Sequence, residues 1–205
     1  GSEDLSLTAG TGNIDFDGIV GGTPLGAVTV VSAANLTADF AFSAASLSQT
    51  AGTGTSTFSG ALSTSGVGGI TLDGTNFAFA STVTAALGSL DIDASGTVSF
   101  QGAVTTSEAS AGSVTITNAS TLTLGAGADF TLEGAFLQDG VGAVSSGGDL
   151  TTTNDAVSFS GAVTLTGAVA ISTGAGAGTI TFASTLDGSE DLSLTAGTGN
   201  IDFDG

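Results

Sequence analysis

The first eighteen residues, GSEDLSLTAGTGNIDFDG, recur without a change at Gly188–Gly205. The second copy begins 187 residues after the first, so residues 1–187 form one repeat unit and residues 188–205 open the next. Self-similarity at a fixed period is typical of repeat architectures, in which each unit packs against its neighbours. We therefore expect no domain boundary at residue 188. We also expect the chain to belong to a tandem array or a head-to-tail polymer, with residues 188–205 continuing it as residues 1–18 begin it.

A shorter pattern, apolar-x-Phe-x-Gly-Ala-Val, recurs inside the unit. It is clearest at residues 98–104 (VSFQGAV) and 157–163 (VSFSGAV). Aligning the central positions gives nine repeats per unit with a mean length of about 21 residues, within the range of solenoid repeats. The alignment predicts one ladder of stacked core side chains. Its members are Phe16, Phe42, Phe58, Phe79, Phe100, Leu132, Phe159, Phe182 and Phe203. Ile116 is the aligned residue of the repeat between Phe100 and Leu132.

Within each short repeat, apolar residues alternate with Ser, Thr or Asp, which is the period of a half-buried strand. Ile14 and Phe16 should point inward, and Asp15 and Asp17 outward. Gly-rich segments between the strands suit tight corners. The sequence thus predicts an all-β parallel β-solenoid (β-helix) of about nine coils of about 21 residues per 187-residue unit, with coils about 4.8 Å apart. The two longest spacings predict surface excursions at residues 20–26 and 138–148.

The composition excludes several classes of function. All charged residues are acidic, giving a net charge of -19, and Lys, Arg, His, Cys, Met, Trp and Tyr are absent. Without Lys or Arg no phosphate clamp can form, so we expect no nucleic-acid partner. No apolar run is long enough for a membrane helix, so no membrane span is expected in this part of the chain. A chain without trypsin sites or easily oxidised side chains suits a long-lived extracellular or cell-surface material, secreted from the cell.

The carboxylates are the only candidates for a metal or catalytic site. Asp15 and Asp17, and likewise Asp91 and Asp93, lie about 7 Å apart on one side of a strand. Such oxygens could share Ca²⁺ between coils, or they could be solvated charges that keep a fibre soluble. We expect no other cofactor. Paired carboxylates also cleave glycosidic bonds, but no basic or aromatic polar residue is available to bind a sugar. We therefore expect no catalytic residues and no enzyme.

Two further patterns allow more than one interpretation. Thr-x-Thr triplets, such as Thr115/Thr117, could form an ice-binding face, or they could be outward residues with good strand propensity. Asn35-Leu36-Thr37 and Asn118-Ala119-Ser120 are formal glycosylation acceptors. Their asparagines could instead form side-chain ladders at the corners of the coils.

The segment from Ala9 to Val30, AGTGNIDFDGIVGGTPLGAVTV, resembles the repeats of giant bacterial surface proteins. These are the adhesins of the filamentous-haemagglutinin-like and autotransporter type, and a weaker likeness recurs wherever Phe-x-Gly-Ala-Val is found. The resemblance implies a secreted parallel β-helix used for adhesion or as a surface fibre. Repeats of that family usually carry some Lys and Arg on the outside, whereas this sequence has none.

These observations favour a structural repeat module of an extracellular bacterial fibre, sheath or giant surface adhesin. Its expected partners are further copies of itself, stacked end to end, with side-by-side association as a second arrangement. The alternatives are a non-covalently stacked filament subunit and a Ca-dependent or carbohydrate-active β-helix.

Overall fold

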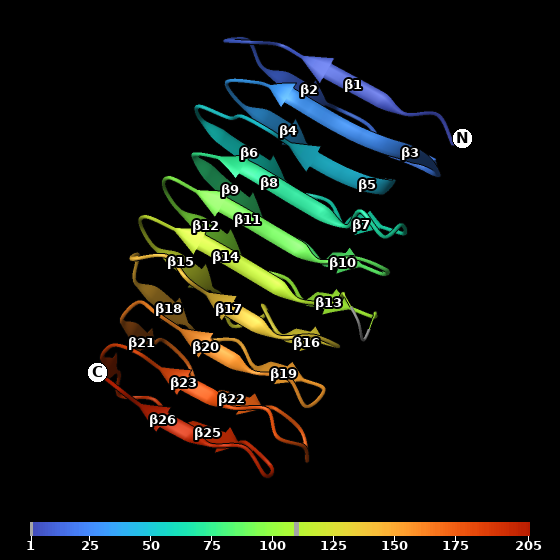
Figure 1. The fold of residues 1–205 in the computed structure, drawn as a ribbon. Coiled ribbons are helices and arrows are strands. Elements are labelled where there is room, and N and C mark those ends of the chain that lie inside the picture. Colours follow the sequence, from blue (N-terminus) through green and yellow to red (C-terminus); the bar gives the residue numbers. More distant parts are fainter. Residues whose placement is uncertain (1, 109–110) are drawn as a thin grey trace.

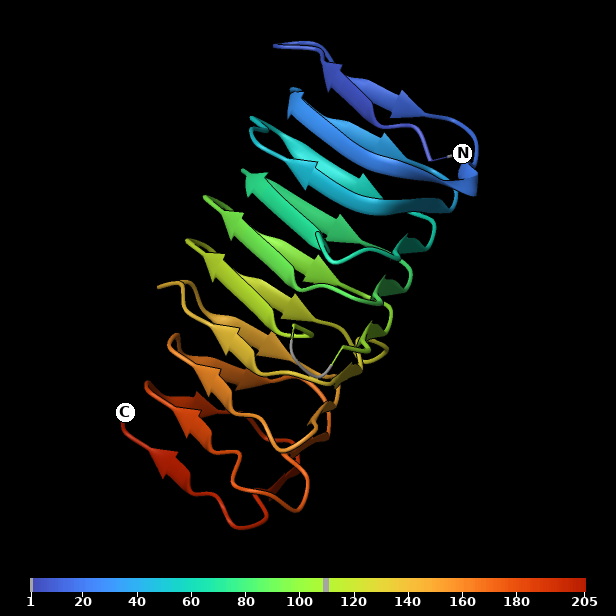
Figure 2. The ribbon, with the colours of Figure 1, turned by 45° about the vertical axis from the view of Figure 1, so that its right-hand side comes forward.

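A computed structural model describes residues 2–108 and 111–205. It confirms the predicted fold class: the chain is a parallel β-solenoid of about nine coils of about 21 residues, and its described residues contain no helix. Every strand pair is parallel, and the coils lie one below another from the N-terminal to the C-terminal end (Figure 1). A second view shows the same succession of rungs from another side (Figure 2).

Each coil contributes strands to three faces, which we number in the order in which the chain visits them. Face 1 contains β1 (Leu5–Thr8), the second part of β3 (Val20–Ser32), the second part of β5 (Phe42–Gln49), β8 (Ile70–Gly74), β11 (Leu90–Ala94), β14 (Val114–Asn118), β17 (Phe136–Gln138), β20 (Val157–Phe159), β23 (Ile180–Phe182) and β26 (Ile201–Phe203). Face 2 contains β2 (Ile14–Phe16), β4 (Leu36–Ala38), β6 (Thr55–Phe58), β9 (Asn76–Phe79), β12 (Val98–Phe100), β15 (Leu122–Leu124), β18 (Val144–Ser146), β21 (Val163–Leu165) and β24 (Leu186–Asp187). Face 3 contains the first parts of β3 and β5, β7 (Leu62–Thr64), β10 (Val83–Ala85), β13 (Val104–Thr106), β16 (Phe130–Leu132), β19 (Leu150–Thr152), β22 (Val169–Ser172) and β25 (Leu192–Thr195).

The strands stay in register although the coils differ in length. On face 3, Val104 pairs with Phe130 and Phe130 pairs with Leu150, although the first of these steps along the chain is clearly longer than the second. The additional residues therefore lie in the corners rather than in the ladders. Because a one-residue slip would turn every apolar side chain outward, burial of the core fixes the register of each strand.

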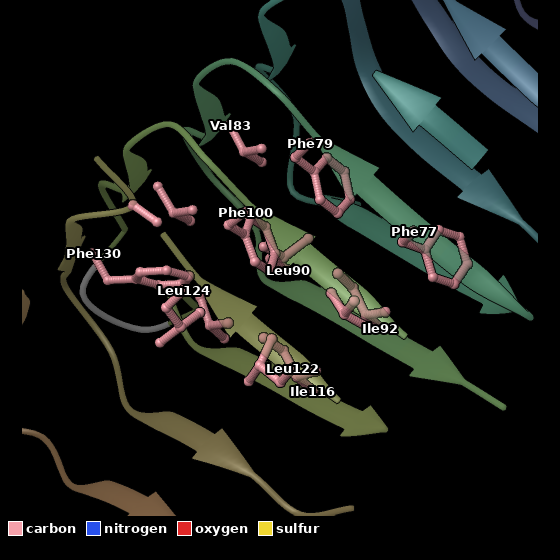
Figure 3. Close-up of a cluster of buried hydrophobic side chains, with 14 of the residues drawn as sticks. Phe77, Phe79, Val83, Leu90, Ile92, Phe100, Ile116, Leu122, Leu124 and Phe130 are labelled. Atoms are coloured by element: carbon pink, nitrogen blue, oxygen red, sulfur yellow. The ribbon is translucent and has the colours of Figure 1, made fainter. Parts of the chain in front are cut away.

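The core contains an unbroken column of ten phenylalanine rings. Consecutive ring centroids are 4.7–6.2 Å apart. Phe79 and Phe100 stack at 4.7 Å, and Phe100 meets Phe130 edge to face at 5.3 Å (Figure 3). The members, in order, are Phe16, Phe42, Phe58, Phe79, Phe100, Phe130, Phe136, Phe159, Phe182 and Phe203.

The column differs from the predicted ladder in its middle. Leu132 is buried, but the rings between Phe100 and Phe159 are Phe130 on face 3 and Phe136 on face 1. The alignment by spacing assumed one anchor on the same strand of every coil. The column instead moves from one face to another, because rings on neighbouring faces meet inside the narrow core.

The two predicted excursions are also different in the structure. Residues 144–146 form β18 on face 2, and Gln138 is fully buried, so the predicted excursion is confined to the corner between them, where Val141 is 91% exposed. Residues 20–26 lie inside β3, where the register with β5 shifts between Val20 and Leu25. The exposed residues Gly22, Thr23 and Pro24 lie at this irregularity.

Glycine at the corner between faces 2 and 3 is required by the coil above. A Cβ on Gly60 would collide with the backbone of Phe40 and Ala41, whereas a Cβ on Gly18, at the same corner of the first coil, would meet nothing within 4 Å. We expect Gly60→Ala to lower the free energy of unfolding by about 1–3 kcal/mol through overpacking, and Gly18→Ala to change it by less than about 0.5 kcal/mol. Urea titrations of the two variants check this; equal effects would contradict the stacked corner.

The two copies of the eighteen-residue segment lie on different faces. Leu5–Thr8 pairs with β3 on face 1, whereas the identical Leu192–Thr195 pairs with β22 on face 3. Ile14–Phe16 lies on face 2, whereas Ile201–Phe203 lies on face 1. The second copy stacks below β22 and β23. From face 1 of the first coil to face 3 of the ninth, one repeat unit advances the chain by eight coils and two faces, which is one face short of nine full coils.

Candidate functional site

The four predicted calcium ligands are not brought together. Asp15 lies outward on face 2 in the first coil, and the exposed Asp17 follows it at the corner. Asp91 and Asp93 lie on face 1 in the fifth coil, on β11. Asp91 accepts a hydrogen bond of 2.7 Å from the Ser89 hydroxyl. The two pairs are therefore separate surface features.

The sequence analysis missed a third carboxylate beside the second pair. Asp73 on β8 is the register partner of Asp93 on β11, so the two lie on neighbouring rungs about 4.8 Å apart. A shallow open depression follows this part of face 1, lined by Thr71, Asp73, Asp91, Asp93 and Thr115 among others. The matching patterns Leu72-Asp73 and Ile92-Asp93 could have identified the pair. Among the described residues, no three carboxylates converge closely enough to hold a metal ion.

Because every charge is negative, stability should depend on ionic strength rather than on calcium. The carboxylates repel one another, and Asp73 faces Asp93 directly. We expect raising NaCl from about 0.01 M to 0.5 M to screen this repulsion and to stabilise the fold by on the order of 1 kcal/mol, about 2–4 °C in melting temperature. At matched ionic strength, we expect CaCl₂ and a chelator to give the same melting temperature. A loss of several degrees on chelation would instead indicate a bound ion.

Face 3 carries a continuous row of hydroxyl groups. One outward position of each strand is serine or threonine on eight successive coils, although the coils differ in length: Ser43, Ser63, Thr84, Thr105, Thr131, Thr151, Ser172 and Thr195. This regularity follows from the strand register. The row is therefore a regular feature of the outer surface of face 3.

The two asparagines of the formal glycosylation motifs both make side-chain contacts between coils. At the corner between faces 1 and 2, the Asn13 Oδ1 accepts hydrogen bonds from the backbone N–H and the side-chain amide of Asn35, at 3.2 and 3.0 Å. The Asn35 Oδ1 in turn accepts one from the Thr55 N–H at 2.9 Å. Asn118 is fully buried, and its Oδ1 accepts a hydrogen bond from the next coil. These contacts correspond to the ladder interpretation.

A polar cluster surrounds Gln138, which is buried. Its amide donates to the Asn118 Oδ1 at 2.8 Å and to the Gly140 carbonyl at 2.7 Å, and its Oε1 accepts from the N–H groups of Ser160 and Gly161 at 3.0 and 2.8 Å. The side chain thus joins three successive coils. Its hydrogen bonds hold these coils together.

At each end of the stack, the terminal strand has a neighbouring strand on one side. In the described residues β26 pairs only with β23, and β1 only with β3. Phe203 is the last ring of the column and is 58% exposed, whereas Phe182 above it is 1% exposed. The lower end therefore presents a strand edge and an apolar core surface of the kind that other coils cover.

Within residues 2–108 and 111–205, no helix is long and apolar enough to cross a membrane. Comparisons with protein-family models, with curated proteins and with solved structures found no match. The chain is thus placed by its architecture alone, as a parallel β-solenoid of the kind that β-helical adhesin repeats form.

Proposed function

We propose that this chain is a structural repeat module of an extracellular fibre, sheath or giant surface adhesin. The observation that carries the proposal is the uninterrupted stack: one ring column and three in-register ladders extend from the first coil to the last. Each coil contacts its neighbours through backbone hydrogen bonds and apolar ladders, so stability grows with the number of coils. Such a stack transmits force along its axis without any specialised site.

The absence of basic and oxidisable residues supports an extracellular location. The sequence contains no Lys or Arg at which trypsin-like proteases could cut. It also contains no Cys, Met, Trp or Tyr that could be oxidised. The resemblance of Ala9–Val30 to filamentous-haemagglutinin-like repeats supports the adhesin version of the proposal.

The proposal is tested with chains of one, two and three 187-residue units. Electron microscopy should show rods of constant width that lengthen by about 42 Å per unit, because each unit adds eight and two-thirds coils of about 4.8 Å. Particles that grow in width, or separate globules joined by linkers, would overturn the proposal. The mass of the natural polypeptide under denaturing conditions then distinguishes the covalent array, which gives a very large chain, from a filament of short subunits stacked end to end.

A further inference from the structure

We infer that successive 187-residue units follow one another rotated by one third of a turn about the solenoid axis. Each strand of the next unit therefore lies one face away from the face that the same strand occupies in the present unit. This inference rests on the proposed function, since it concerns units joined in one fibre. Its basis is that residues 188–205 already show the phase of the next unit. They repeat residues 1–18 letter for letter, yet lie on faces 3 and 1 instead of faces 1 and 2.

The local backbone of the two copies is the same, so the change of face is not a change of local structure. Gly10 and its counterpart Gly197 both have positive φ, 62° and 55°. The Gly12 N–H donates to the Ala9 carbonyl at 2.9 Å, and the Gly199 N–H donates to the Ala196 carbonyl at 2.7 Å. The same turn thus forms the corner between faces 1 and 2 in one copy and between faces 3 and 1 in the other. The segment can therefore occupy either corner without changing its own conformation.

What fixes the phase is the number of strands in a unit. The chain moves to a new face at each corner, and one complete unit carries it one face short of nine coils. Since identical units repeat the same strand count, each unit must start one face back from the previous one. Three units together make 26 whole coils, which extend about 125 Å at 4.8 Å per coil. Equivalent residues therefore lie on the same side of the fibre in every third unit.

The second copy of the segment can make the same contacts with a following coil that the first copy already makes with the coil below it. In the first copy, the Asp4 Oδ1 accepts a hydrogen bond of 2.8 Å from the Ala27 N–H of the coil below. Its counterpart Asp191 lies beside face 3 with no coil beneath it in the described chain. The edges of β25 and β26 and the exposed Phe203 complete this surface. The occupant they fit is the counterpart of residues 19–38, which contain β3 and β4, the strands that pair with the first copy.

A consequence is that no side of the fibre is unique. Features confined to one face of a unit, such as the Asp73–Asp93 pair on face 1, come to lie on all three sides in turn along the fibre. Charge is thereby distributed around the axis, and any partner that recognises one face meets it once in every three units on a given side.

The phase is tested first in the 205-residue chain, which contains no cysteine. Ala170 and Ser193 are register partners on face 3, so Ala170→Cys with Ser193→Cys should form a disulfide, because neighbouring rungs bring their Cα atoms within the permitted range. If the second copy lay on face 1 as the first does, Ser193 would instead lie beside Thr181 of β23, and Thr181→Cys with Ser193→Cys would crosslink. Thr151→Cys with Ser172→Cys, partners further up face 3, is the matched positive control.

We expect the first pair and the control to oxidise to a disulfide at least about tenfold faster than the Thr181/Ser193 pair. If the control pair forms a disulfide and the Ala170/Ser193 pair does not, the inference is overturned. A second measurement uses a chain of three units with Ser63→Cys in each, biotinylated and marked with streptavidin. The markers should project from three sides of the rod. Rods with all markers on one side would overturn the rotation but leave the fibre function intact, whereas a failure to form rods would overturn the fibre function itself.

Discussion

Replacing Phe100 by alanine is expected to lower the free energy of unfolding by about 3–5 kcal/mol. Phe100 is fully buried at the middle of the ring column, stacked on Phe79 at 4.7 Å and edge to face with Phe130 at 5.3 Å (Figure 3). Alanine leaves a cavity that neighbouring coils cannot close, because their positions are fixed by the backbone ladders on both sides. It also removes two ring contacts of about 0.5–1.5 kcal/mol each beyond the area they bury.

The matched control is Phe40→Ala. Phe40 is 53% exposed and belongs to no ring pair of the column, so its removal should cost less than about 0.5 kcal/mol. Urea unfolding of both variants gives the comparison, and hydrogen exchange locates the effect. For Phe100→Ala, protection should fall first in β9, β12 and β15, since each coil depends on its nearest neighbours. Similar losses of stability in the two variants would contradict a continuous ring column.

Gln138→Leu is expected to destabilise the chain by at least about 3 kcal/mol, although leucine is apolar and of similar size. The substitution leaves the Gly161 N–H, the Asn118 Oδ1 and the Gly140 carbonyl without their partner inside the core. Each buried polar group left unsatisfied costs about 1–3 kcal/mol. Hydrophobicity alone would predict the opposite sign.

The control for this prediction is Gln101→Leu. Gln101 lies exposed at the corner after β12, and its amide donates a hydrogen bond of 3.0 Å to the Ser99 hydroxyl of the same coil. Its replacement should change stability by no more than about 0.5 kcal/mol. Thermal melts and urea titrations of the two leucine variants distinguish them. A Gln138→Leu protein as stable as the parent would show that residue 138 lies at the surface, as the excursion predicted from the sequence would have it.

The sequence was sufficient for the fold class and for the direction of most side chains. A period of two with glycine between the strands leaves few alternatives to β-structure, and Val98 and Phe100 point inward as their alternation predicts. What it could not provide was the face on which each strand lies. Alternation separates inside from outside but carries no information about how many corners precede a strand. The alignment therefore chose Leu132 where the column uses Phe130 and Phe136.

The candidate sites were harder to predict because they depend on contacts between coils. Asp73 and Asp93 belong to different coils and are adjacent only through the ladder of β8 and β11. Gln138 follows inward positions that are otherwise apolar, and its burial is explained by hydrogen bonds to the coil above, at Asn118, and to the coil below, at Ser160 and Gly161. Both cases required the register, which depends on corner lengths that leave no simple mark in the sequence. The identical residues 188–205 make the same point, since their face follows from strand count rather than from local composition.

The central claim is that short strands lie perpendicular to a single axis, with one coil stacked on the next. X-ray diffraction from oriented films of a multi-unit chain tests it most directly. The account predicts a strong reflection near about 4.8 Å along the long axis of the particles, the spacing between successive coils. The same reflection perpendicular to that axis would mean that the strands extend along the fibre, and it would contradict the solenoid on which every other inference depends.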